Sequence, residues 1–207
     1  MVGARGIEPL TPSMSRKCST AELSARMASR IDNRRPPRNG IDVANLVLRA
    51  AAGADLTAIM AIERAPGYER RVGRSTQAEH EAMLAGPRHA YFVGERDGVE
   101  AFAILRDLDD PHGNVYLKRI AARPGRGAGR ALLSLLIDEI FTHGAAHRFH
   151  LDAFDDNAPA LALYAALGFS RDGVLREAYL DPDGRRRDLA LLALTRPQWL
   201  SRAAPAR

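Results

Sequence analysis

The chain has a single cysteine, Cys18, among its 207 residues. One cysteine excludes an intrachain disulfide and any metal site built from several thiolates. The histidines supply no clear alternative, because His143, His147 and His150 straddle the end of a predicted helix and the turn after it. We therefore expect no bound metal.

A long apolar run is also missing. No stretch approaches the roughly 18 to 20 apolar residues of a membrane-spanning helix, and no charged-then-apolar leader opens the sequence. These absences predict a cytoplasmic protein without a membrane partner. Apolar residues make up 46% of the chain, which predicts one sizeable core in a chain too short for two full domains.

The excess of positive charge lies at one end of the chain. The first 45 residues carry eight Lys and Arg against four Asp and Glu, whereas the remaining residues carry 22 against 21. A nearly neutral body argues against a nucleic-acid-binding face, which needs clustered basic side chains. Recruitment to RNA through the basic N-terminal segment is the alternative that this distribution leaves.

The N-terminal segment lacks apolar periodicity, apart from a short possible helix around Thr20–Ile31. We predict three parts: a disordered basic segment over residues 1–45, a folded domain over 46–196 and a C-terminal tail over 197–207. The opening residues also resemble the conceptual translation of a transfer-RNA gene upstream of a reading frame. We therefore expect the natural protein to begin later, near Met27; the alternative is a genuine basic tail.

The strongest local pattern runs from Val115 to Gly144, where a strand, a glycine-rich turn and a helix follow one another. From Gly127 onward the apolar residues recur at steps of three and four, which gives the helix one apolar face. This face consists of Ala128, Ala131, Leu132, Leu135, Leu136 and Ile140. The helix ends with His143 in its last turn and with Gly144, which we expect to adopt a left-handed conformation.

The turn between strand and helix, Arg123–Arg130, holds three glycines at alternate positions among basic residues. Glycines let backbone N–H groups point inward, and the helix start adds unpaired donors and a positive dipole end. The pattern predicts a site for a phosphate or pyrophosphate; the alternative is a turn that only caps the helix. It is not a P-loop, because no Gly-Lys-Ser/Thr follows, and it lacks the third glycine of a dinucleotide-binding fingerprint.

The other elements follow from similar patterns. Predicted strands cover Leu46–Ala50, Tyr91–Glu95, Val99–Arg106, Val115–Ala122, Arg148–Phe154, Val174–Leu180 and Arg187–Leu194. Predicted helices run from Asp55 to Arg64, from Glu79 to Ala85, from Gly127 to His143, and onward from Asn157. This order predicts an α/β fold, a mixed sheet with helices on both faces.

A second motif, Leu151–Phe169, places Asn157 at the start of a helix and Tyr164 two turns further along, close to the same helical face. Together with the glycine turn, this N-x6-Y-x3-G-F pattern resembles the GNAT superfamily of N-acetyltransferases over roughly Leu46–Leu194. The turn resembles the acetyl-CoA-binding motif of that superfamily. The second motif resembles the segment that carries its catalytic tyrosine.

One position departs from the family pattern, because Pro124 stands where the family has Gln or Arg, three residues before Gly127. Within the superfamily, the chain looks most like the ribosomal-protein alanine N-acetyltransferases and related small-amine acetyltransferases. LKRI in the strand, PGRGAGRALL in the turn and GVLREAYLDPDG near the end carry that likeness. The resemblance implies a mixed, mostly antiparallel sheet that is splayed at its centre, with helices on both faces.

The resemblance also implies acetyl-CoA as cosubstrate, with its pantetheine arm in the V between Leu117–Ala122 and Phe149–Phe154. The binding residues that it implies are Ile120, Ala121, Ala122, Gly125, Arg126, Gly127, Ala128, Gly129, Arg130, Asn157 and Tyr164. The family reaction is direct attack of an amine on the acetyl thioester. The acceptor is left open between a protein α-amino group, a polyamine and an antibiotic amine, and the assembly between a monomer and a homodimer.

Two catalytic residues are expected. Tyr164 would donate a proton to the departing thiolate, since a phenol with a pKa of about 10 is protonated at neutral pH. Glu63 is the favoured base because the end of the first helix lines the acceptor pocket in this family, with Asp152, Glu177 and His150 as alternatives. The competing interpretation is a non-catalytic acyl-CoA-binding or sensor module, against which Tyr164 argues.

Overall fold

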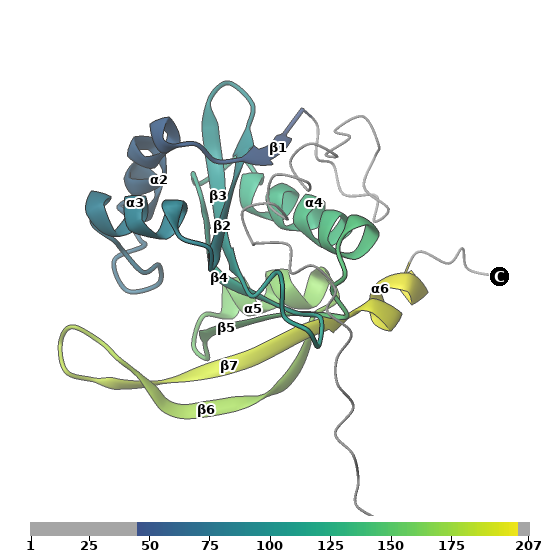
Figure 1. The fold of residues 1–207 in the computed structure, drawn as a ribbon. Coiled ribbons are helices and arrows are strands. Elements are labelled where there is room, and N and C mark those ends of the chain that lie inside the picture. The colour runs from purple at the N-terminus through teal and green to yellow at the C-terminus, as the bar shows by residue number, and fades with distance from the viewer. Residues whose placement is uncertain (1–44, 203–207) are drawn as a thin grey trace, which may run out of the picture.

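The structure, a computed structural model, describes residues 45–202; the predicted N-terminal segment lies outside the described residues except for its last position. Seven strands form one sheet in the order β1-β2-β3-β4-β5-β7-β6 (Figure 1). Their bounds are β1 Val47–Ala50, β2 His89–Glu95, β3 Val99–Arg106, β4 Asn114–Ala122, β5 Arg148–Phe154, β6 Ser170–Leu180 and β7 Arg186–Thr195. Each predicted strand is present, and β6 begins earlier than predicted.

The helical elements are η1 Gly53–Asp55, α2 Leu56–Glu63, α3 Gln77–Ala85, α4 Ala128–His143, α5 Ala158–Ala166 and α6 Arg196–Arg202. The sequence patterns predict neither the 3₁₀ turn η1 nor α6. The remaining succession of strands and helices confirms the predicted α/β fold. Across residues 45–202, none of the helices has the length and apolar character that crossing a membrane requires.

The sheet separates at its centre. Neighbouring strands are antiparallel except β4 and β5, which pair in parallel only as far as Leu117 and Leu151. Beyond that point β4 stays paired to β3 up to Ala122, and β5 stays paired to β7 up to Phe154. Figure 1 shows the two halves of the sheet turned sharply away from each other. The expected central splay is confirmed, and we call the space between the separated ends of β4 and β5 the splay.

Helices on both faces of the sheet divide its apolar side chains into two cores (Figure 1). On one face α2 and α3 pack against β2, β3 and β4, around fully buried side chains such as Ile59 and Phe102. On the other face α4 and α5 cover the sheet, around Leu132 and Phe149. Strands β2 and β3 are covered on both sides, so their side chains form nearly continuous buried runs.

Helix α4, which leads away from the splay, begins and ends at glycines. Gly127 is its N-cap and has a left-handed conformation, with φ of 65°. Gly144 is extended, with φ of −88° and ψ of 164°, so the predicted left-handed conformation at this position is wrong. A glycine fits there for another reason: a Cβ would lie only 2.5 Å from the carbonyl oxygen of Ile140, which accepts a hydrogen bond from the Gly144 N–H.

The prediction of a tail from residue 197 is wrong as far as Arg202. Helix α6 packs on the domain through Trp199, which is 4% exposed and stacks on Phe141 of α4 with ring centroids 5.6 Å apart. The indole Nε1 donates a hydrogen bond to Asp138 at 2.9 Å. One aromatic side chain therefore anchors this helix, and no periodic pattern marks it in the sequence.

We expect Trp199→Ala to lower the free energy of unfolding by about 3–5 kcal/mol, because the change removes a buried aromatic side chain and leaves a cavity beside Phe141. Chemical denaturation followed by circular dichroism measures this difference. Leu200→Ala is the matched control, since Leu200 is 51% exposed and its truncation should cost less than about 0.5 kcal/mol. Equally small effects of the two changes would show that α6 does not pack on the domain.

Candidate active site

A pair of side chains bridges β4 and β5 where they separate. Tyr116 of β4 donates a hydrogen bond from its hydroxyl to Oδ2 of Asp152 of β5, at 2.5 Å. Asp152 directly follows Leu151, the last residue of β5 that pairs with β4, so this bond lies at the apex of the splay. Burial and the hydrogen bond to Asp152 raise the pKa of Tyr116. The His150 ring lies tilted against the Tyr116 ring, with 5.2 Å between the centroids, and burial lowers the pKa of its imidazole, which favours the neutral ring at neutral pH.

Tyr164, the expected proton donor, lies on α5 and is 8% exposed. Its ring stands edge-on to Phe169, with 5.9 Å between the centroids. Burial, and then the charge of Asp152, raise the pKa of Tyr164 to about 12. Within residues 45–202 its hydroxyl takes part in no hydrogen bond. The phenol is therefore protonated at neutral pH and its proton is available to a bound molecule.

Asn157 occupies the N-cap position of α5, where the sequence predicts it, and a proline follows in the first turn. Its backbone carbonyl accepts a hydrogen bond from the Leu161 N–H at 3.0 Å. Its side chain forms no capping hydrogen bond to the helix. The amide of Asn157 is therefore not committed to holding α5.

The separated half of β4 contains Ile120, Ala121 and Ala122, which were expected to bind pantetheine. The next residue, Arg123, donates its N–H to the Glu100 carbonyl of β3, so by the alternation of an antiparallel ladder the Ala122 backbone points away from β3. The hydroxyl of Tyr68, from the loop between α2 and α3, donates to the Ala122 carbonyl at 2.7 Å from that outer side. The backbone groups of Ile120 and Ala122 thus face the splay, whereas the Ala121 side chain is buried against the α2 core.

The glycine turn after β4 exposes a row of backbone donors. Gly125 and Gly127 have φ of 88° and 65°, a left-handed conformation that other residues adopt only with strain. In the described part of the chain, the N–H groups from Gly125 to Arg130 donate to no backbone acceptor. They lie at the N-terminus of the sixteen-residue helix α4, whose dipole favours a negative charge at this end. The turn therefore has the donors that a pyrophosphate requires.

The two arginines of the turn that were expected to bind the cosubstrate differ in their contacts. Arg126 is held by Glu100 at 2.5 Å, and Glu100 is 3% exposed. Arg130 is exposed and forms no ion pair with another residue of the described segment. Arg130 is therefore the side chain of the turn whose charge is still available to an anion.

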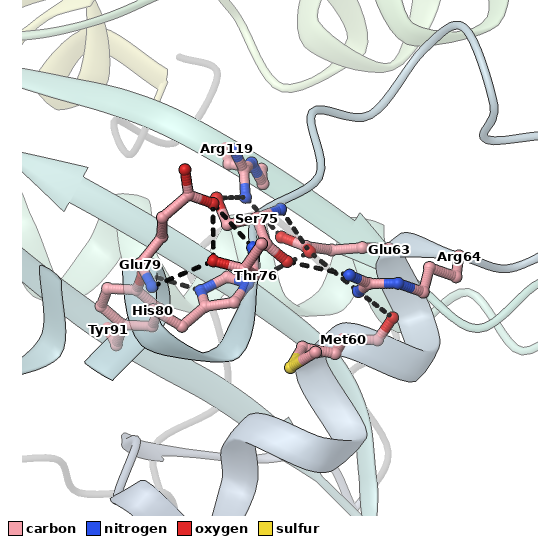
Figure 2. A network of polar contacts seen from close by, with 9 residues as sticks. All are labelled: Met60, Glu63, Arg64, Ser75, Thr76, Glu79, His80, Tyr91 and Arg119. Atoms are coloured by element: carbon pink, nitrogen blue, oxygen red, sulfur yellow. Dashed lines mark hydrogen bonds and ion pairs between the residues drawn. The ribbon is translucent and has the colours of Figure 1, made fainter. Parts of the chain in front are cut away.

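Glu63, the favoured base in the sequence analysis, lies in a buried polar network (Figure 2). One carboxylate oxygen accepts a hydrogen bond from Arg119 of β4. The other oxygen contacts His80 Nε2 at 3.1 Å and the Ser75 N–H at 3.4 Å. His80 Nδ1 contacts the Tyr91 hydroxyl at 3.0 Å, so a neutral ring with its proton on Nε2 donates to Glu63 and accepts from Tyr91.

This network changes what is expected of Glu63. Its side chain is 0% exposed, and both of its oxygens are already bonded within the protein. A carboxylate in this state is suited to hold Arg119 and the α2–α3 unit in place, and it is poorly suited to receive a proton from an acceptor amine. Arg119 and His80 were not predicted from the sequence, although the charged pair Lys118-Arg119 inside a largely apolar strand was a usable signal.

The chain is similar to known acetyltransferases in sequence and in structure. A sequence model of the acetyltransferase (GNAT) family matches residues 56–169, which include the glycine turn and Tyr164. The ribosomal protein bS18-alanine N-acetyltransferase of Escherichia coli is 38% identical over 117 residues, which cover 55% of this chain and 76% of that enzyme. The spermine/spermidine N(1)-acetyltransferase of Bacillus subtilis is 29% identical over 94 residues, which cover 43% of this chain and 62% of that enzyme.

Solved structures share the same architecture. A crystal structure of the ribosomal-protein alanine N-acetyltransferase from Escherichia coli superposes with a TM-score of 0.60 at 30% identity, covering 72% of this chain and 93% of that one. A mutant form of the spermidine N-acetyltransferase SpeG from Vibrio cholerae gives a TM-score of 0.67 at 22% identity, covering 78% and 99% of the two chains, which supports the fold alone. The family match, the sequence identity and the fold agree, and the chain belongs to the acetyltransferase (GNAT) family of acyltransferase enzymes.

Proposed function

We propose that this protein transfers an acetyl group from acetyl-CoA to a primary amine by direct attack in a ternary complex. The observation that carries the proposal is the splay itself, with uncommitted backbone donors at the glycine turn and the hydrogen bond from Tyr116 to Asp152 at its apex. The charge of Asp152 also acts on Tyr164. The names of the bacterial relatives, which describe acetylation of a protein alanine and of polyamines, support an amine acceptor.

The residues around the splay fit the cosubstrate. Backbone N–H groups from Gly125 to Arg130 would bind its pyrophosphate, and the outward-facing backbone of Ile120 and Ala122 would pair with its pantetheine amides. The Ala122 carbonyl already accepts a hydrogen bond from Tyr68. A carbonyl oxygen has two lone pairs, so a second donor can share it with Tyr68 or replace Tyr68 there.

Acetyl-CoA supplies the thioester whose C–S bond breaks as the amine nitrogen forms its bond to the carbonyl carbon. The protein must then move one proton from the nitrogen and deliver one to the sulfur. The Tyr164 phenol would deliver its proton to the thiolate and regain one from solvent. Asn157, two turns earlier on α5 and free of a capping bond, would help to orient the bound thioester.

Asp152 is the base that the geometry favours among the candidates. Its carboxylate lies at the apex of the splay, and its charge raises the pKa of Tyr164, so the two groups are near enough to interact electrostatically. Glu63 is enclosed by its own network, and Glu177 lies exposed on the edge strand β6. A protonated amine has no lone pair, so the neutral amine attacks after its ammonium proton has left to water. Asp152 would then accept, through water, the proton that the nitrogen releases as the C–N bond forms.

Tyr164→Phe should keep the affinity for acetyl-CoA within a few fold and lower kcat by at least about ten-fold, since donation from a positioned acid is typically worth about 10²–10⁴ in rate. The readout is thiol release with an alanine-initiated peptide as acceptor, alongside calorimetric titration with acetyl-CoA. The wild-type rate should show no loss from phenol ionisation up to about pH 10, because the pKa of Tyr164 is raised. An unchanged kcat with a lower melting temperature would make Tyr164 a core residue only.

The variants Asp152→Asn and Glu63→Gln should distinguish a residue that acts in catalysis from one that stabilises the fold. Asp152→Asn should lower kcat/KM at least about ten-fold with little change in stability, because an amide oxygen can still accept the Tyr116 hydrogen bond. Glu63→Gln should lower the free energy of unfolding by about 3 kcal/mol, because Arg119 loses its buried counter-charge, while the folded variant keeps most of its kcat. A large loss of kcat in Glu63→Gln, with little loss in Asp152→Asn, would identify Glu63 as the base.

A further inference from the structure

A cavity of about 560 Å³ lies between the loop that joins α2 to α3 and the β6–β7 hairpin. We call it the arginine cavity, because five of its lining residues are arginines: Arg70, Arg71, Arg185, Arg186 and Arg187. The two walls are in direct contact, since Arg187 donates a hydrogen bond to the Arg70 carbonyl at 3.4 Å. The cavity is therefore built from segments more than a hundred residues apart in the sequence.

The arginine cavity lies at the open end of the splay. Gly67 and Glu69, which line it, flank the tyrosine whose hydroxyl bonds to Ala122 at the end of β4. On the other side, Asp156 lines it two residues after the end of β5, and Arg187 stacks on Phe154 at 4.1 Å. A molecule in the cavity would therefore be next to the ends of both separated strands.

The charges in the cavity do not balance. Arg187 pairs with Asp156 at 2.5 Å and lies 3.5 Å from Asp181, so these two carboxylates are already partnered. Arg70 pairs with Asp183 at 3.4 Å. Counted together, five arginines face four carboxylates, so the cavity has an excess of one positive charge. Three of the guanidinium groups, those of Arg71, Arg185 and Arg186, have no ion pair inside residues 45–202.

We propose that the acceptor is a peptide amino terminus with acidic residues close behind the amine, and that these residues bind Arg71 and Arg185. The inference rests on the proposed function and specifies its acceptor. A guanidinium presents paired N–H donors that match a carboxylate, so an acidic segment gains both charge and geometry in this cavity. A polyamine or a lysine-rich segment would add positive charge to a cavity that already has an excess of it, which disfavours such an acceptor.

The test compares kcat/KM for three peptides of equal length that begin with alanine and differ only at the next three positions, which hold aspartate, serine or lysine. Spermidine is the fourth acceptor. We expect the acidic peptide to exceed the basic one by on the order of ten-fold, from two exposed ion pairs, and the ratio to shrink as salt is added. A basic peptide or spermidine that equals or exceeds the acidic peptide would overturn the inference.

The double variant Arg71→Ser/Arg185→Ser assigns the preference to the cavity. The ratio of acidic to basic kcat/KM should fall towards one in this variant and should persist in Arg88→Ser, an exposed arginine outside the cavity. A preference that survives the double variant contradicts the inference. If the serine peptide is acetylated but the charge of the next three residues does not change kcat/KM, the inference fails while the proposed function stands. If no thiol is released from acetyl-CoA with any of the four acceptors, both fail.

Discussion

The limited pairing of β4 with β5 is the constraint on which the rest of the site depends. The two strands pair only as far as Leu117 and Leu151 and then follow different partners. Backbone polar groups beyond that point have no strand opposite them, and buried polar groups need partners. The Tyr68 hydroxyl donates a hydrogen bond to one such group, the Ala122 carbonyl. A ligand with amides of its own can form hydrogen bonds with the others, so the break in strand pairing that leaves these groups unpaired also makes a binding surface.

The network around Glu63 holds the loop between α2 and α3 against that surface. Glu63 ends α2, Ser75 precedes α3, and both meet at Arg119 on the separated half of β4. The loop between the two helices is therefore fixed at both ends, and Arg64 adds a hydrogen bond to the Ser75 carbonyl. That loop supplies Tyr68 to the splay and part of the wall of the arginine cavity. One ion pair under the loop thus positions residues of both the proposed cosubstrate site and the proposed acceptor site.

Features that depend on local sequence could be predicted, and those that depend on distant pairing could not. The glycine turn, α4 and the N-cap of α5 each follow from residues within a few positions, and the structure has them as predicted. Glu63 was predicted as the base from its place at the end of the first helix, and its enclosure could not be predicted because its partner Arg119 lies 56 residues later and reaches it only through the sheet. The hydrogen bond from Tyr68 to Ala122 joins residues 54 positions apart, and no pattern in either segment predicts it.

Hydrogen exchange with and without acetyl-CoA tests the central claim most directly, because the claim concerns backbone amides in named positions. Binding should slow exchange of the amides from Gly125 to Arg130 and of Ile120 and Ala122 by at least about ten-fold, since a ligand that fills the splay reduces their opening. The amides of the edge strand β6 should exchange at the same rate in both states. Protection that is absent from the glycine turn and β4, or concentrated in β6, would contradict this account of the splay as the cosubstrate site.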